Sequence, residues 1–222
     1  MFDSQFAPYQ PLQFEAWHPP GYGLATFGFR GNTNYDGVGS VTSWDMAKPA
    51  GVVDGDFLLM FISQANPETP STVPTGFTNI QTSVADHGGA NCLTYYKIAS
   101  GEGSTWTWGY TTGKETSACL IALIGGTYDT IGQTEDGTGS TAPSAPSITV
   151  ANSGSILIAA NGAKDTNYTG TPSGYTEVMN VTTNQNLWLG YKTGVASGAS
   201  GTAAWTYDTS KKNDSILVSV GP

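Results

Sequence analysis

Short apolar stretches separated by turn residues recur along most of this chain, and their length predicts β-strands. Residues 57–62 and 118–124 are continuously apolar, which indicates central strands covered on both faces. In residues 106–110, apolar and polar positions alternate with the period of two expected of a half-buried strand. Turn signals stand between these stretches, such as Val-Asp-Gly at residues 53–55 and Pro-Thr-Gly at residues 74–76.

Many short strands at close spacing are typical of a β-sandwich or a jelly roll. Before a central break, strands are predicted at about residues 38–46, 56–64, 77–84, 91–99, 104–112 and 117–125. After the break, they are predicted at about 147–151, 155–161, 175–182, 186–193, 202–208 and 214–220. The break itself, residues 132–147, is rich in Gly, Ser, Thr and Pro and predicts a flexible or extended connection.

The two sides of the break carry the same short motifs in the same order. The matched segments are 55–60 with 154–159, 74–78 with 172–176, 96–97 with 191–192, 99–101 with 196–198, and 106–108 with 205–207. The matched residues form turns and strands, whereas Asp54 and Asp56 become Ser153 and Ser155 in the second copy. The repeat therefore indicates a duplicated scaffold, with halves at about 38–131 and 140–222.

Two arrangements of these halves are open. Each half could form its own small sandwich, or both could share one larger sandwich. We favour a single body, because a half of about 80–95 residues with few large apolar side chains would bury only a thin core. The fold class expected is all-β, a jelly-roll-like β-sandwich built from two sequence-related halves.

Residues 1–37 differ from the rest and predict an extended N-terminal arm that precedes a body at 38–222. This segment carries nine aromatic residues, and its four prolines exclude a helix and interrupt any central strand. Such an apolar arm either folds over its own domain or lies along a partner subunit. We favour the partner, which makes the aromatic residues of the arm the candidate partner-binding set: Phe2, Phe6, Tyr9, Phe14, Trp17 and Tyr22.

Composition narrows the functional classes. Gly is abundant at 29 residues and charged residues make up only 11%, which disfavours helices. The net charge is −9 with 8 Lys and Arg in total, and only Lys211 and Lys212 are adjacent. This charge excludes a phosphate-neutralising face, so neither a nucleic acid nor an anionic membrane is an expected partner. No secretion signal or membrane span is expected from the apolar runs, which are of strand length.

Candidate chemistry in the sequence is sparse, and no enzyme is expected. The only histidines are His18, in the arm, and His87, in a loop, and no Gly-x-Ser-x-Gly elbow surrounds a serine. Asp54 and Asp56 flank Gly55 as calcium ligands do, but the second copy of this turn lacks both acids. We therefore expect no catalytic residues, no cofactor and no metal.

Cys92 and Cys119 each lie inside an apolar strand pattern. This placement predicts buried free thiols that act as small hydrophobic side chains. A disulfide between neighbouring strands is the alternative that the sequence leaves open.

The tryptophans suggest a second kind of site. Trp106, Trp108, Trp188 and Trp205 could form a platform on which sugar rings stack. Trp106 and Trp205 are equivalent in the repeat and lie within predicted strands, which favours positions in the core instead.

The succession of motifs resembles the β-sandwich modules of tailed-bacteriophage virion proteins. The residues that carry this resemblance are 55–62, 74–78, 93–99, 106–108 and 118–125, and the likeness covers about residues 50–222. Such modules often carry Pro-x-Gly-Trp-Thr, and here Phe77 and Tyr175 take the place of that tryptophan. The resemblance implies a virion role as a capsid-decorating, tail-fibre or receptor-binding protein, and it supplies no catalytic residues.

These observations together predict a non-enzymatic virion structural protein, a capsid decoration or cement protein anchored by its N-terminal arm. The alternatives are a tail-associated or receptor-binding protein and a glycan-binding module. The expected partners are other virion subunits, either the major capsid protein or tail proteins, with a host surface glycan under the second alternative. Analogy with phage appendages adds a homo-oligomer, with a homotrimer as the first choice.

Overall fold

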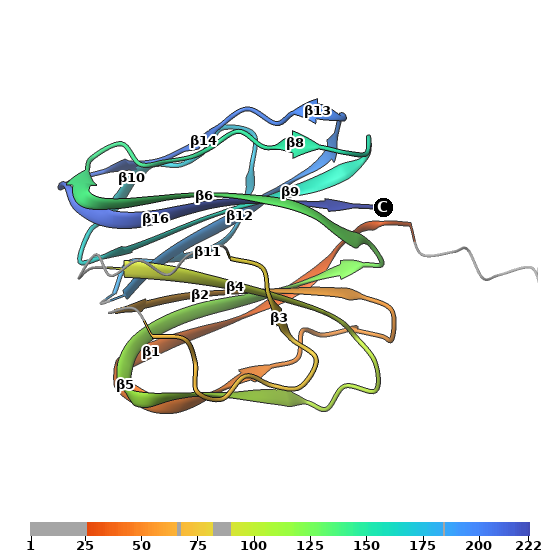
Figure 1. Ribbon diagram of the computed structural model, residues 1–222, viewed down its shortest axis with the longest axis horizontal. Coiled ribbons are helices and arrows are strands. Elements are labelled where there is room, and N and C mark those ends of the chain that lie inside the picture. The colour runs from red at the N-terminus through yellow and green to blue at the C-terminus, as the bar shows by residue number, and fades with distance from the viewer. Residues whose placement is uncertain (1–25, 66–67, 82–89, 184) are drawn as a thin grey trace, which may run out of the picture.

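Two five-stranded antiparallel sheets stack face to face in this protein (Figure 1). The structure is a computed structural model that describes residues 26–65, 68–81, 90–183 and 185–222. Within these ranges the regular structure is entirely β, and no helix is present. The all-β sandwich expected from the hydrophobic pattern is therefore confirmed.

Each sheet comes from one part of the chain. The first contains β1 (Gly28–Ala47), β2 (Phe57–Ala65), β3 (Thr78–Asn79), β4 (Ala90–Ile98) and β5 (Thr105–Ile124). The second contains β6 (Thr127–Ser140), β9 (Ser155–Lys164), β11 (Thr176–Val181), β12 (Gln185–Val195) and β16 (Lys211–Gly221). The strand orders, β1-β5-β2-β4-β3 and β6-β16-β9-β12-β11, correspond position by position. Jelly-roll connectivity, in which successive strands change sheets, is not confirmed, because the strands of each sheet follow one another in sequence.

A central core lies between the two sheets. Alternate residues of the middle strands face inward, with Phe57, Leu59 and Phe61 from β2 and Ile156 and Ile158 from β9. Across this core, β4 packs against β9 and β16, while β12 packs against β2 and β5. When each strand is replaced by its counterpart in the other sheet, the contact of β4 with β9 becomes that of β12 with β2, and the contact of β4 with β16 becomes that of β12 with β5. The two sheets are therefore related by an approximate twofold axis.

Two aromatic stacks at the edges of the sheets follow the same relation. Phe29 of β1 stacks on Tyr191 of β12, with ring centroids 4.4 Å apart. Tyr128 of β6 stacks on Tyr96 of β4, with centroids 5.5 Å apart. Phe29 pairs with Leu123 of β5, and Tyr128 pairs with Val220 of β16. Because Leu123 and Val220 hold corresponding positions in these two strands, Phe29 and Tyr128 correspond to each other. Each stack therefore joins an edge strand of one sheet to the other sheet.

An outer layer covers the far face of the first sheet. Strands β1 and β5 are long and curve together around one end of the sheet, so that their paired outer parts lie against it (Figure 1). This return brings Trp44, Met46 and Trp108 against the outward-facing Leu58 and Met60 of β2 in a second buried cluster.

The second sheet is covered by short strands instead. These are β7 (Ser144–Ala145), β8 (Thr149–Val150), β10 (Tyr168–Gly170), β13 (Gly198–Ala199), β14 (Ala203–Ala204) and β15 (Thr206–Tyr207). Ala145, Ala203 and Trp205 of this layer pack on Leu157 and Trp188 of the sheet. Each half thus has its own outer cluster and shares the central one.

The structure moves two boundaries predicted from the sequence. Residues 28–37, assigned to the arm, form the first part of β1 and pair with β5, while residues 1–25 lie outside the described residues. Residues 132–140, predicted as a connection, belong to β6 and pair with β16. Strand β6 lies at the edge of its sheet with mostly half-buried residues, so it needs no alternating apolar pattern and its sequence resembles a linker.

Close approach of the halves predicts that Gly162→Ala destabilises the protein by about 1–3 kcal/mol. A Cβ at Gly162 would meet the Cys92 sulfur and lie 2.7 Å from Ser63 Oγ, across the central core. Ser63 cannot turn away freely, because its hydroxyl donates a 2.8 Å hydrogen bond to the Asn186 carbonyl.

Urea unfolding of the wild type and variant measures this difference. The control is Gly103→Ala, because Gly103 is exposed and a Cβ there meets nothing closer than 4.0 Å. Equal stability of the Gly162 variant and the control would contradict the tight packing of the halves at this point.

Candidate functional site

The two ends of the sandwich differ in chemistry. Strand β1 begins at Gly28 and β16 ends at Gly221 at the same end, on the right of Figure 1, which we call the proximal end. Strands β2 and β9 end at Ala65 and Lys164 at the opposite end, which we call the distal end. The central core is apolar toward the proximal end and becomes polar toward the distal end.

The buried polar residues of the distal end tie the two halves together. They are Ser63, Gln64, Asn91, Thr116, Ser117, Asn161, Gln185, Asn186, Asn213, Asp214 and Ser215. Ser117 Oγ donates to the Gln185 carbonyl at 2.6 Å, and Gln185 Nε2 donates to Ser63 Oγ at 2.8 Å. Because hydrogen bonds in a buried site have strict geometry, this network fixes how one sheet is placed on the other.

Asp214 is the ionisable group at the centre of this region, with 1% of its surface exposed. Its carboxylate accepts the Cys92 backbone N–H at 3.0 Å and the Gln81 amide at 3.3 Å. The Gln133 amide nitrogen lies 3.1 and 3.0 Å from its two oxygens. The pKa of Asp214 is raised to about 8, chiefly by burial, with a smaller contribution from the charge of Glu135 and against the opposing hydrogen bond from Cys92. Asp214 is therefore a protonated acid at neutral pH.

The hydrogen bonds that Asp214 accepts from Cys92, Gln133 and Gln81 favour its charged form, but burial outweighs them. The side-chain oxygens of Gln81 and Gln133 are buried and have no hydrogen-bond partner in the described part of the chain. The group holds a proton but is closed to solvent, which favours a structural role over a catalytic one.

The cysteines are both buried and free, as the apolar strand pattern predicted. Burial raises the pKa of each thiol. Both residues therefore stay as thiols, and neither is an activated nucleophile.

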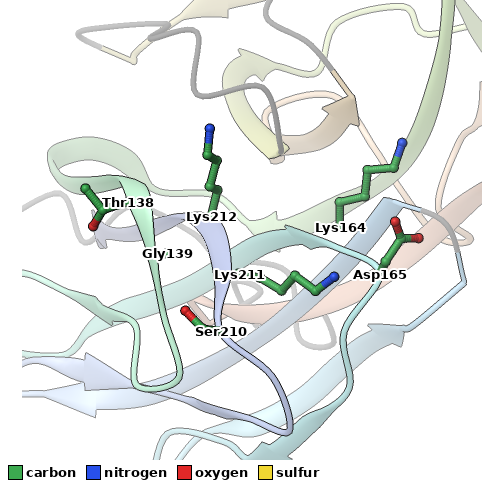
Figure 2. Close-up of a pocket in the computed structure, with 7 residues that line it drawn as sticks. All are labelled: Thr138, Gly139, Lys164, Asp165, Ser210, Lys211 and Lys212. Atoms are coloured by element: carbon green, nitrogen blue, oxygen red, sulfur yellow. The ribbon is translucent and has the colours of Figure 1, made fainter.

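An open pocket of about 350 Å³ lies at the distal end of the second half (Figure 2). It is lined by Thr138, Gly139, Lys164, Asp165, Ser210, Lys211 and Lys212. The pocket forms where pairing of β6 with β16 is interrupted, since Lys212 alone faces residues 137–139. One Asp136 oxygen accepts the N–H groups of Thr138 and Gly139 at 2.9 and 3.0 Å, which holds this bulge in shape.

The acids weighed as calcium ligands have other partners. One Asp54 oxygen accepts the Gly101 N–H at 2.7 Å. Asp56 is buried and forms an ion pair with Arg30, with contacts of 2.6 and 2.9 Å. Across the described ranges, no three His, Cys, Asp or Glu side chains gather as metal ligands.

The tryptophans considered for a sugar platform are core residues. Trp106 is 6% exposed, Trp108 is fully buried, and Trp188 and Trp205 are each 1% exposed. None of them presents a ring to solvent, so the platform is wrong and the alternative assignment to the core is confirmed. The remaining candidates, which are the six aromatic arm residues together with His18 and His87, lie outside the described residues.

Sequence reasoning missed the residues that the distal end brings together. Lys211 and Lys212 were visible as the only adjacent cations, but Lys164 lies far from them in the chain. The buried acid had one signal in the sequence, since Asp214 is the first residue of a predicted apolar strand.

Comparisons with known proteins add nothing to this picture. No family model matches the chain, and no curated protein or solved structure matches it either. In the described ranges, no helix is long and apolar enough to cross a bilayer.

The raised pKa of Asp214 predicts a pH-dependent stability that Asp214→Asn removes. Between about pH 4 and 8 the folded protein retains a proton that the unfolded chain releases, so wild-type stability falls as pH rises through this window. The free energy of unfolding of the variant, relative to that of wild type, should be a few kcal/mol higher at pH 8.5 than at pH 4.5, since one pKa unit corresponds to about 1.4 kcal/mol.

Urea unfolding across this pH range provides the measurement. The matched control is Asp45→Asn, because Asp45 is exposed on β1. A constant difference between Asp214→Asn and wild type at all pH values would rule out the buried, protonated acid.

Proposed function

We propose that this protein is a non-enzymatic structural protein of a virion, fixed to a neighbouring subunit through residues 1–25. The two-ended body is the observation that carries the proposal. The described chain enters at the proximal end, whereas the polar network and the lysine-lined pocket occupy the distal end. An anchor at one end and a different surface at the other suit a protein that decorates a particle.

The entry of the chain into the body supports a rigid attachment. Phe27 packs against the central core, and Phe29 stacks on Tyr191 of the second sheet. Arg30 forms its ion pair with the buried Asp56 immediately afterwards. Because residue 27 onward is fixed to both halves, an anchor formed by the preceding residues would hold the whole sandwich in one orientation.

The state of the polar groups favours a structural role. Asp214 and the cysteines are buried, and the distal polar side chains bond to one another across the halves. The three packed cores and the hydrogen-bonded distal end make the body rigid. A protein that decorates the surface of a particle needs such rigidity.

Capsid decoration is the first choice among virion roles. A tail fibre needs a long shaft, and the described residues form a sandwich without one. The partners under this proposal are the major capsid protein and further copies of this chain, with a homotrimer as the assembly suggested by analogy. A tail-associated, receptor-binding role is the second candidate, favoured by the pocket at the end opposite the chain entry.

Deleting residues 1–25 should leave a folded sandwich that no longer binds particles. The deletion stops before Phe27 because removing residues up to 37 would also take Arg30 from Asp56 and half of β1 from β5. Co-sedimentation with particles assembled from the capsid and tail proteins of the same genome measures binding, and thermal unfolding checks the fold.

A full-length variant tests whether binding needs the aromatic side chains of the arm or only the presence of the segment. It carries serine in place of four aromatic residues of the arm, Phe2, Phe6, Phe14 and Trp17, and should also lose binding. Undiminished binding by the deleted protein would contradict the anchoring role, and a full-length protein that binds no particle would contradict the virion proposal.

A further inference from the structure

We propose that the distal pocket is a binding site for an anionic group, a carboxylate, sulfate or phosphate carried by a ligand of about monosaccharide size. This inference goes beyond the virion role and does not depend on it. Three of the chain's 8 basic residues line one pocket in a protein of net charge −9. Such local concentration of cations is unexpected in an acidic protein without a partner of opposite charge.

Two of the three ammonium groups form no ion pair in the part of the chain that the structure describes. Lys164 forms a 2.9 Å ion pair with Glu115 of the first half. Neither Lys211 nor Lys212 forms an ion pair within the described ranges. Figure 2 shows Lys164 and Lys212 extending to the same side, with Lys211 between them and directed toward Asp165. Lys211 and Lys212 are therefore the groups with charge to offer a ligand.

The first half supplies an internal comparison, because its corresponding position is neutralised. Gln64 of β2 and Ala163 of β9 hold corresponding positions, and they pair with Thr116 of β5 and Asn213 of β16. The two residues before each of these partners therefore correspond as well, Lys114 to Lys211 and Glu115 to Lys212. The two places are equivalent in strand register, and their charges differ.

In the first half, each of these charges has a partner. Lys114 lies 3.1 Å from Glu68, whose pKa is lowered to about 2 by hydrogen bonds from Thr112 and Thr111 and by this lysine. Glu115 lies against Lys164. The second half has lysine at both corresponding positions, and neither lysine forms an ion pair within the described ranges. An unneutralised pair at one of two equivalent places points to a ligand rather than to a need of the scaffold.

Shape and polarity define the ligand further. A volume of about 350 Å³ falls at the small end of ligand pockets and suits one sugar ring or a small acid. Ser210 lines the pocket, and its hydroxyl can bond to a hydroxyl or anionic oxygen of a ligand. The Asp165 carboxylate can accept a ligand hydroxyl, and its repulsion of a second negative charge favours a ligand with a single anionic group.

Titration of the isolated full-length protein tests the site. The probes are inorganic phosphate, sulfate and D-glucuronate at constant ionic strength, with chloride and neutral glucose as references. Amide resonances of the pocket residues, Thr138, Gly139, Lys211 and Lys212, should shift in a saturable way with at least one of the three anions and with neither reference. Stronger binding of glucuronate would identify an acidic sugar, and stronger binding of phosphate or sulfate would identify an esterified group.

Paired variants assign the binding to the pocket. The double variant Lys211→Gln with Lys212→Gln should lower the affinity for the anion by about tenfold or more, as expected from losing two charge-assisted contacts. Lys212→Glu, which copies the charge of Glu115 in the first half, should abolish saturation. The matched control is Lys48→Gln with Lys192→Gln, which removes the same charge far from the pocket and should change affinity less than twofold.

Two outcomes would overturn the proposal. One is the absence of saturable shifts at the pocket with all three anions. The other is equal weakening by the pocket variant and the control, which would reduce the effect to net charge. Neither outcome bears on particle binding through residues 1–25, so the two proposals fail separately.

Discussion

Burial of the two inner sheet faces against each other is the constraint on which this structure depends. Each five-stranded sheet carries large apolar side chains on its inner face, and only the other sheet covers them. The outer layers complete each half on its far side but leave this face open. The halves therefore need one another, and the aromatic stacks of Phe29 on Tyr191 and Tyr128 on Tyr96 close the edges of the same interface.

The same interface explains why its two ends differ. Toward the proximal end the facing side chains are apolar, whereas toward the distal end they are hydrogen-bonded across the halves. Buried polar groups are costly unless their partners are in place, so the distal network selects one placement of the sheets. Asp214 lies in this network as a protonated acid because the packed halves leave it almost no access to water.

Duplication of the scaffold separates what folding requires from what it does not. Corresponding strands keep their order, their register and their inward apolar residues, because both sheets face the same packing problem. Charges at the distal edges are under no such constraint, and there the halves diverge: Lys114 and Glu115 are paired, while Lys211 and Lys212 are not. The turn acids diverge as well, since Asp56 meets Arg30 whereas Ser155 bonds to the carbonyl of Asn152.

The hydrophobic pattern by itself determined the all-β class, most strand positions, the repeat, and the burial of Trp106, Trp205 and the cysteines, because these follow from which residues avoid water. It did not determine β6 or the start of β1, because an edge strand is defined by its neighbour and needs no pattern of its own. Only the tertiary structure brought Lys164 beside Lys211 and Lys212 and closed Asp214 off from solvent. Proximity and dielectric environment arise from contacts between residues far apart in the chain, which local sequence does not encode.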